Sequence, residues 1–242
     1  MTALLSLHRV GRSFGGLRAL NEVSLEVSEG EVVGIMGANG AGKTTLFSLI
    51  AGNLRPNSGD ILLRGQSIVG LSPDRICRRG IARTFQIVRP FGGLTVLENV
   101  TIPARFGSAR SDAKAARAIA EEALRMVGLL ARRDEIASSL TLSGQKRLEL
   151  ARAVATGAHI VLLDEVMAGL TATEVAEMLA IIRGLRERHG LTVLIIEHVM
   201  RALMEISERV LVLHHGEAIA IGAPAAVAAD PAVLACYFGD RA

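Results

Sequence analysis

Apolar residues form four short runs that predict buried strands. The runs cover residues 32–36, 159–163, 192–196 and 209–213, and they are rich in Val, Ile and Leu. Short runs of this kind are typical of strands that are buried on both faces of a parallel sheet. Longer segments with helical spacing separate them. The pattern therefore predicts an α/β fold whose core sheet is mainly parallel.

Three earlier segments alternate apolar and polar residues and predict a second kind of strand. Alternation with a period of two is typical of antiparallel strands that have one solvated face. We therefore expect a mixed sheet core preceded by an N-terminal antiparallel β lobe. The segments are 4–10, 24–27 and 60–64, with turns expected at Gly11, Gly30 and Gly65.

The middle of the chain is mainly helical in pattern. We expect one domain over residues 1–242, in which 86–155 form an inserted helical subdomain between the core segments 1–85 and 156–242.

Polar residues at the expected helix ends place the boundaries of these helices. Ser111 is the expected cap of an alanine-rich helix, and another helix begins around Ser143. Thr171 and Glu174 have the spacing of a capping box, which predicts a helix that ends near Gly190.

Composition narrows the class of protein. The chain has 242 residues, and its longest apolar stretches are short or are broken by Gly222 and Pro224, so none is expected to span a membrane. The first residues lack the charged and apolar regions of a secretory signal, so we expect the protein in the cytoplasm. Cys77 and Cys236 lack the spacing of a metal or redox motif.

Basic residues are scattered, and the net charge is only +3. Nucleic acid is therefore not an expected partner. Nearly all basic residues are arginine, since lysine occurs only at Lys43, Lys114 and Lys146. A lysine inside a glycine-rich pattern therefore stands out.

The sequence GANGAGKT at residues 37–44 matches the Walker A pattern of a phosphate-binding loop. It follows the run 32–36 and precedes a helical segment, as this motif requires. Its glycines let backbone N–H groups turn toward phosphates, and a helix N-terminus adds partial positive charge. The Lys43 ammonium is suited to the β and γ phosphates of ATP, and the Thr44 hydroxyl to Mg²⁺. The expected nucleotide contacts are Gly37, Ala38, Asn39, Gly40, Ala41, Gly42, Lys43, Thr44 and Thr45.

Acidic residues follow the run 159–163, as a phosphate-binding loop requires. Asp164 is the expected Walker B residue at the metal, and Glu165 is placed to act as the general base toward the attacking water. His198 follows the run 192–196 and can reach the γ phosphate through its imidazole N–H. Alone, the two acids could be solvated strand ends, and His198 could be structural.

The order of these motifs resembles the ATP-binding cassette (ABC) superfamily, whose glutamine loop matches residues 84–86 and whose switch histidine matches His198. Nearly the whole chain is covered. Within the superfamily, several segments resemble the ATPases of branched-chain amino acid importers. These segments are 14–17, 82–86, 168–170, 196–198 and 231–239.

The resemblance implies a head-to-tail dimer with a second ABC ATPase, identical or paralogous, on two membrane permease subunits. It places the protein peripherally on the cytoplasmic face of the inner membrane, with an indirect partnership to an extracytoplasmic solute-binding protein. It also implies that Phe14 stacks on adenine and that Gln86 joins Mg²⁺ and the attacking water to the helical subdomain, where residues 89–98 receive the permease. Phe14 could equally fill the core, and Gln86 could be an ordinary exposed residue.

The chain departs from the family pattern at the signature loop. The family usually has Leu-Ser-Gly-Gly-Gln there. This pattern aligns with residues 140–144 of the chain, in which both glycines are replaced. The resemblance places Thr141, Ser143 and Gly144 against the nucleotide of the second subunit. In this alignment Thr141 keeps a hydroxyl and Ser143 is the expected helix cap. Val166 replaces a common proline, and Thr171 replaces an aspartate.

We therefore expect an ATP- and Mg²⁺-dependent ATPase that energises an ABC importer for branched-chain or related amino acids. Two alternatives with another function stay open: a soluble ABC ATPase of nucleic-acid or ribosome maintenance, and an ATPase of lipid or lipopolysaccharide export. The altered signature also leaves open a regulatory cassette that binds ATP tightly with little turnover.

Overall fold

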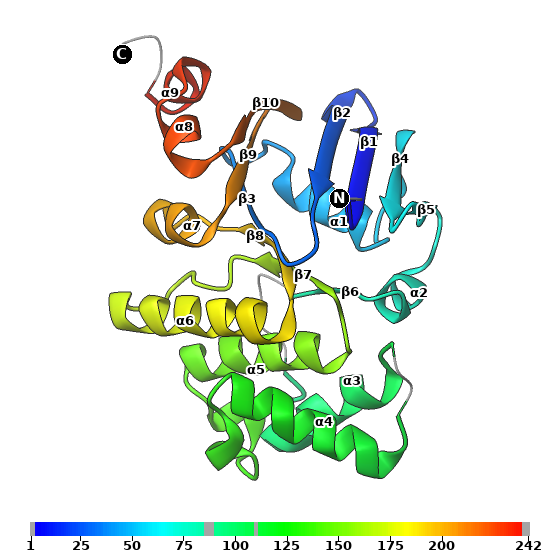
Figure 1. The fold of residues 1–242 in the computed structure, drawn as a ribbon, viewed down its shortest axis with the longest axis vertical. Helices are drawn as coiled ribbons and strands as arrows, with labels where there is room; N and C mark the ends of the chain where they lie inside the picture. Colours follow the sequence, from blue (N-terminus) through cyan, green and yellow to red (C-terminus); the bar gives the residue numbers. More distant parts are fainter. Residues whose placement is uncertain (1–2, 85–89, 109–110, 239–242) are drawn as a thin grey trace. The chain divides into compact units, whose positions relative to one another are not determined.

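The computed structural model describes residues 3–84, 90–108 and 111–238 of the chain. The chain divides into two compact units. Unit 1 contains residues 1–73 and 192–242, and unit 2 contains residues 74–191. Figure 1 shows the elements of both units with their labels.

The first strands of unit 1 form an antiparallel sheet with the order β2-β1-β4-β5. Leu5 and Leu7 of β1 are buried, whereas His8 is exposed. The sheet confirms the predicted β lobe and is visible beside α1 in Figure 1. Its strands are β1 (Leu5–Phe14), β2 (Leu17–Val27), β4 (Ser58–Leu63) and β5 (Gln66–Ser67).

Gly11 does not form the predicted turn, because β1 continues through it to Phe14. The register of β1 against β4 shifts between His8 and Gly11. A Cβ atom at Gly11 would lie 2.5 Å from the Ser58 Oγ atom, so glycine lets β4 approach closely. The predicted turns at Gly30 and Gly65 are present, with φ values of 73° and 75°.

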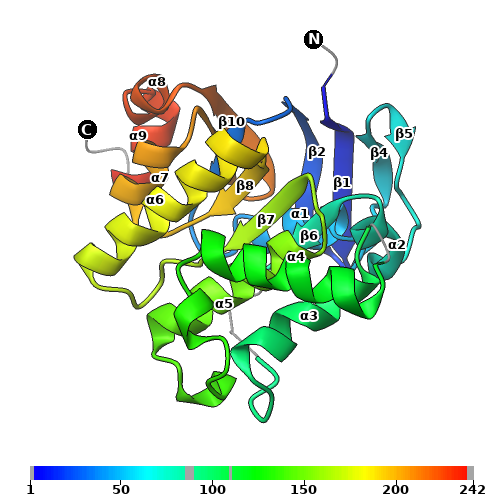
Figure 2. The same cartoon turned by 60° about the horizontal axis from the view of Figure 1, so that its bottom comes forward.

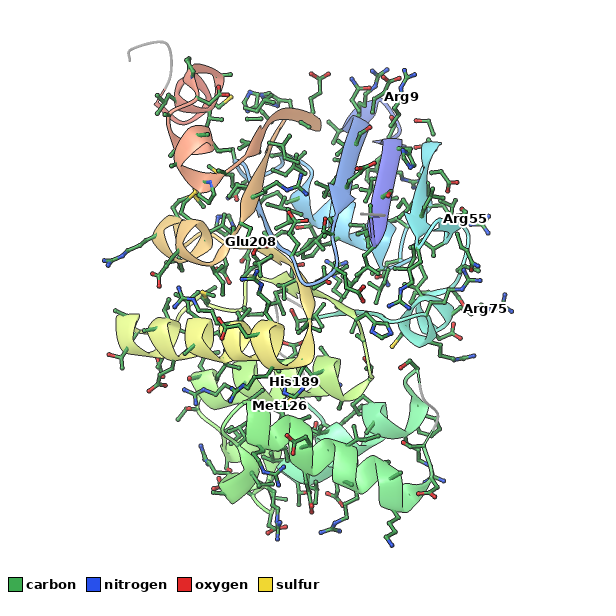
Figure 3. The ribbon with its side chains drawn as sticks, viewed as in Figure 1. Arg9, Arg55, Arg75, Met126, His189 and Glu208 are labelled. Carbon is green, nitrogen blue, oxygen red and sulfur yellow. The ribbon has the colours of Figure 1, made fainter. Side chains whose placement is uncertain are left out.

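The irregular part of β1 also carries an exposed ion pair. Arg9 and Glu22 have positive φ values of 47° and 50°, and their side chains pair across β1 and β2 at 2.7 Å. Figure 3 labels Arg9 on this pair of strands. Because both side chains are well exposed, this ion pair contributes little to stability.

The core strands of unit 1 follow the order β10-β9-β3-β8. β3 pairs in parallel with β8 and β9, and β10 pairs antiparallel with β9, so the sheet is mixed. Every residue of β3 and β8 is buried, as the apolar runs predict. The strands are β3 (Val32–Met36), β8 (Thr192–Ile196), β9 (Arg209–His214) and β10 (Glu217–Gly222).

Four helices complete the described part of unit 1. A Cβ atom at Gly34 of β3 would lie 3.0 Å from the Leu203 side chain, so α7 packs closely on this strand. The helices are α1 (Lys43–Ile50), α7 (Met200–Ile206), α8 (Pro224–Ala228) and α9 (Pro231–Phe238).

Among its described residues, unit 2 combines two parallel strands with a group of helices. Figure 2 shows α3, α4 and α5 side by side, and these three helices contact one another. The strands are β6 (Ile81–Arg83) and β7 (Ile160–Asp164). The α-helices are α2 (Pro73–Arg78), α3 (Val96–Phe106), α4 (Ala113–Met126), α5 (Leu142–Ala155) and α6 (Ala172–His189), and the short 3₁₀ helices are η1 (Leu130–Arg132) and η2 (Ala137–Ser139).

The predicted cap of α4 is wrong by one residue. Asp112 caps the helix, because its side chain accepts a hydrogen bond from the Ala115 amide at 2.8 Å. Ser111 instead donates its hydroxyl to the Ala104 carbonyl at 2.8 Å. The carboxylate also interacts favourably with the positive end of the helix dipole.

The capping box of α6 is confirmed. The Thr171 hydroxyl accepts from the Glu174 amide, and the Glu174 carboxylate accepts from the Thr171 amide at 2.8 Å. These bonds lower the pKa of Glu174, because both the amide and the hydroxyl of Thr171 stabilise its charged form. The helix ends at Gly190, whose φ of 63° is left-handed.

None of the described helices combines the length and the apolar character that crossing a bilayer requires.

Replacing Thr171 by alanine is expected to lower the free energy of unfolding by about 1 kcal/mol, because the first turn of α6 loses its cap. The matched control is Thr173→Ala, an exposed position in the same turn, with an expected change below about 0.5 kcal/mol. Urea denaturation of both variants measures the difference. Equal losses would contradict the capping role.

The cap effect is also expected to depend on pH. Because the pKa of Glu174 is lowered in the folded protein, its contribution is complete above the ordinary value of 4.5 and is lost as the pH falls through the folded value. The difference between the wild type and Thr171→Ala should therefore shrink in acid. If the difference in stability between the two proteins stays constant across this pH range, the Glu174 carboxylate does not contribute to the cap.

Candidate nucleotide-binding site

The glycine-rich loop of unit 1 follows β3 and leads into α1. A Cβ atom at Gly37 would lie 2.2 Å from the Leu213 carbonyl oxygen, and one at Gly42 would lie 2.5 Å from the Ala19 carbonyl oxygen. Both glycines have positive φ values, 150° and 106°. The backbone can therefore take this path only without side chains at these two positions.

Gly40 also has a positive φ, 80°, but a Cβ atom there would have nothing within 4 Å. The loop is thus wedged against its neighbours at both ends and open at its tip. The open tip therefore leaves room for a phosphate group beside the backbone.

The Lys43 ammonium lies inside this loop. Its ammonium donates to the Gly37 carbonyl at 2.6 Å and to the Ala38 carbonyl at 3.0 Å, and the residue is only 7% exposed. Since an ammonium is costly to bury without acceptors, the loop carbonyls fix its position. The charge therefore lies where a phosphate chain would enter the loop.

The N-terminus of α1 carries no compensating negative charge. Gly42 gives no side-chain cap, and the first turn contains no acidic residue. Thr44 is exposed and Thr45 is half-buried in this turn. The positive end of the helix dipole thus favours an anion beside the loop.

The loop and His198 leave the same edge of the sheet. β3 and β8 run parallel with Ile35 opposite Ile196, so Gly37 and His198 each stand two residues beyond an equivalent position. Glu197 is buried at 1% exposure, whereas His198 is exposed. The structure therefore brings His198 to the strand ends from which the loop begins, as ligand sites of parallel sheets require.

Phe14 ends β1 at the tip of the β lobe. Its ring is 43% exposed, so it does not fill the core. The Arg12 guanidinium lies 4.7 Å from the ring centroid, a cation–π contact that orients the ring. An oriented and partly exposed ring is suited to stacking on a flat base.

In unit 2, Asp164 ends β7 in a buried ion pair that the sequence did not predict. Its Oδ2 atom lies 2.8 Å from Arg83 Nη2, and the two side chains are 4% and 9% exposed. Its amide donates to the Thr84 hydroxyl at 3.1 Å. Arg83 ends the neighbouring parallel strand β6, and only the pairing of β6 with β7 reveals this neighbour. Gln86, which follows in the chain, lies outside the described residues.

Glu165 has an unusual backbone conformation. Its φ is 53°, in the left-handed region that non-glycine residues seldom adopt. Its carbonyl accepts from the Lys146 ammonium at 2.8 Å and from the Ala168 amide at 3.3 Å. Strain of this kind concentrates at functional sites and persists where surrounding contacts fix it. Val166, where the family commonly has proline, is buried at 1% exposure.

The signature loop differs from expectation at its cap. Thr141, not Ser143, caps α5, because its Oγ1 atom accepts from the Gly144 amide at 3.3 Å. Ser143 and Gly144 are buried, whereas Thr141 and Leu142 are exposed. The prediction failed because both residues are good caps and helix packing on the buried side decides between them.

Comparison with known proteins places the chain in a family. The pattern that defines the ABC transporter family matches residues 20–168. The chain is 39% identical to the high-affinity branched-chain amino acid transport ATP-binding protein LivG of Escherichia coli K12, over 98% of each chain.

Solved structures agree. The ADP conformation of MJ1267, an ATP-binding cassette of an ABC transporter, superposes with a TM-score of 0.89 at 28% identity, covering 99% of this chain and 100% of that one. The dimeric post-hydrolysis state of the cassette MJ0796, bound to ADP and Pi, gives a TM-score of 0.80 at 27% identity, covering 91% of this chain and 98% of that one.

Replacing Arg83 by methionine is expected to lower the free energy of unfolding by about 3 kcal/mol, because Asp164 would remain buried without its partner. The control is Arg78→Met, which breaks the exposed Arg78–Asp74 pair, at an expected cost below about 1 kcal/mol. Thermal or urea unfolding measures both. A loss at Arg83 as small as the control's would show that other groups hold Asp164.

Proposed function

Because the chain belongs to the ABC transporter family, we propose that it is the ATP-hydrolysing subunit of an importer for branched-chain or related amino acids. The observation that carries this proposal is the identity to LivG over almost the full length of both chains. The geometry of the glycine-rich loop supports the ATPase part independently, because it combines an open backbone cradle with a buried ammonium.

The glycine-rich loop and the start of α1 bind the phosphates. Residues 37–45 present backbone N–H groups, and the Lys43 ammonium exchanges its loop carbonyls for phosphate oxygens. Phe14 stacks on the adenine, which its partial exposure allows. The ADP-bound neighbour MJ1267 supports nucleotide binding by this fold.

The metal site fits Mg²⁺ in its chemistry. Mg²⁺ prefers oxygen ligands, keeps several waters and needs few protein groups. The Thr44 hydroxyl, the Asp164 carboxylate and the Gln86 amide oxygen supply such oxygens. When bound, the ion neutralises charge on the phosphates. Asp164 is already held by Arg83, so its carboxylate is oriented before any metal arrives.

Hydrolysis requires a base and a group that holds the γ phosphate. We assign the base to Glu165, which accepts a proton from the attacking water. His198 donates its imidazole N–H to the γ phosphate, and Gln86 orients the water. The carboxylate of Glu165 is presented by a strained backbone, which pre-organises it.

The proposed partners follow from the transporter role. Two permease subunits carry the substrate, and an extracytoplasmic solute-binding protein delivers it. A second ABC ATPase, the same or paralogous, completes each site through its signature loop, as this chain's loop with Thr141, Ser143 and Gly144 does in return, Thr141 being the exposed residue of the three. The dimeric state of MJ0796 supports this arrangement. The protein then works peripherally on the cytoplasmic face of the inner membrane.

Co-purification tests the importer role. The tagged chain is expressed in its own cells, membranes are solubilised in mild detergent, and bound proteins are identified by mass spectrometry. Multi-spanning permeases together with a solute-binding protein of the same transporter are the expected result. Recovery with ribosomal partners alone, or with lipid-export components, would favour one of the two alternatives and overturn this proposal.

Two substitutions separate ATP binding from hydrolysis. Lys43→Met is expected to weaken ATP binding about tenfold or more, since a hydrogen bond to a charged group contributes about 1.5–3 kcal/mol. Glu165→Gln should keep ATP binding and lower turnover by about a hundredfold or more. The control is Lys114→Met, an exposed position on α4. Fluorescent-nucleotide binding and phosphate release measure both effects; full turnover in Glu165→Gln would exclude its role as base.

A further inference from the structure

Lys146 is a buried lysine with a specific acceptor. It lies in α5, is 4% exposed, and donates its ammonium to the Glu165 carbonyl at 2.8 Å. Burying an ammonium costs free energy, and an apolar side chain of similar length would fill the same space without that cost. A role in packing alone therefore does not account for a lysine here.

The acceptor of this bond is the backbone of the residue that we assign as the base. Glu165 is left-handed, with φ at 53°, and its carbonyl also accepts from the Ala168 amide at 3.3 Å. Two donors on one carbonyl fix the orientation of this peptide group. The turn from Glu165 to Ala168 is thus held from the side by Lys146.

α5 contacts the segment after β7 through Leu142, Lys146 and Arg147. A Cβ atom at Gly169 would lie 3.0 Å from the Leu142 side chain, Lys146 reaches Glu165, and Arg147 forms an ion pair with Glu177 of α6. The Lys146 bond is the contact that ends on the Glu165 backbone. A shift of α5 would therefore be transmitted to the residue that carries the carboxylate.

We infer that Lys146 is a positioning residue that fixes the left-handed turn at Glu165 and couples the signature helix α5 to the general base. The inference rests on the proposed role of Glu165. α5 begins at the signature loop, which faces the nucleotide of the second cassette in the proposed dimer. Nucleotide bound at one site thus influences the base of the other through a single hydrogen bond and a rigid helix.

Hydrogen exchange on the nucleotide-free full chain tests the contact without activity. In Lys146→Met, amides 166–168 are expected to exchange several-fold faster, while amides 148–155 of α5 keep their rates. This contrast separates positioning from a general loss of helix packing, which would raise exchange along α5. Unchanged exchange at 166–168 would overturn the inference, and so would faster exchange along the whole of α5.

Kinetics test the consequence for the base. In Lys146→Met, kcat is expected to fall about tenfold to a hundredfold, because small misplacements of a reacting group have effects of this size. ATP affinity and KM should stay within about twofold of the wild type, because such a loss falls only on the transition state. Lys146→Arg, which keeps a charged donor, should restore part of kcat. Lys114→Met, at an exposed position, is the matched control, and its exchange rates and turnover are expected to equal those of the wild type.

Failure of this inference can be told apart from failure of the proposed function. If Glu165→Gln keeps its turnover, Glu165 is not the base, and the exchange rates at 166–168 alone decide whether Lys146 fixes the turn. If Glu165→Gln is inactive and Lys146→Met keeps full kcat, the positioning role is wrong. Should Lys146→Met not fold, Lys146→Gln is measured with the same expectations.

Discussion

The close approach of the backbone around the glycine-rich loop is the constraint on which the site in unit 1 depends. Leu213 at the end of β9 and Ala19 of β2 place carbonyl oxygens where side chains at Gly37 and Gly42 would have to lie. The Gly216 amide further donates to the Ala41 carbonyl at 3.1 Å. The loop is thus shaped by strands from distant parts of the chain, and its Gly37 and Ala38 carbonyls hold the Lys43 ammonium.

In unit 2, two basic residues hold the two acidic residues at the end of β7. Arg83 binds the Asp164 side chain, and Lys146 binds the Glu165 backbone. The two contacts act differently, since the first orients a carboxylate through its charge and the second fixes a peptide group. Lys146 is buried and the Arg83 side chain is only 9% exposed; unpaired charge is costly at such sites, so each contact is favoured over its loss.

The altered signature loop keeps a sound helix start despite the missing glycines. Thr141 provides the cap, and a Cβ atom at Gly144, which stands at the glutamine position of the signature, would lie 3.2 Å from the Leu140 Cβ atom, so Gly144 is packed inside the unit. The exposed positions are Thr141 and Leu142. The surface that the proposed second cassette meets is therefore a hydroxyl beside an apolar side chain rather than bare backbone.

The sequence by itself determined the features that depend only on residues close together in the chain, namely strands, helix caps and the loop motif. The runs 32–36 and 192–196 form β3 and β8 with the predicted bounds, and the loop motif lies at the end of β3. The capping box of α6 is present, as its spacing predicts. These features could be predicted because periodicity and cap chemistry act over a few residues. Tertiary structure decided the rest. The Arg83–Asp164 and Lys146–Glu165 contacts join residues 81 and 19 positions apart, and Gly11 lies within a strand because β4 approaches it. Such partners are set by strand pairing and helix packing, which no local pattern encodes.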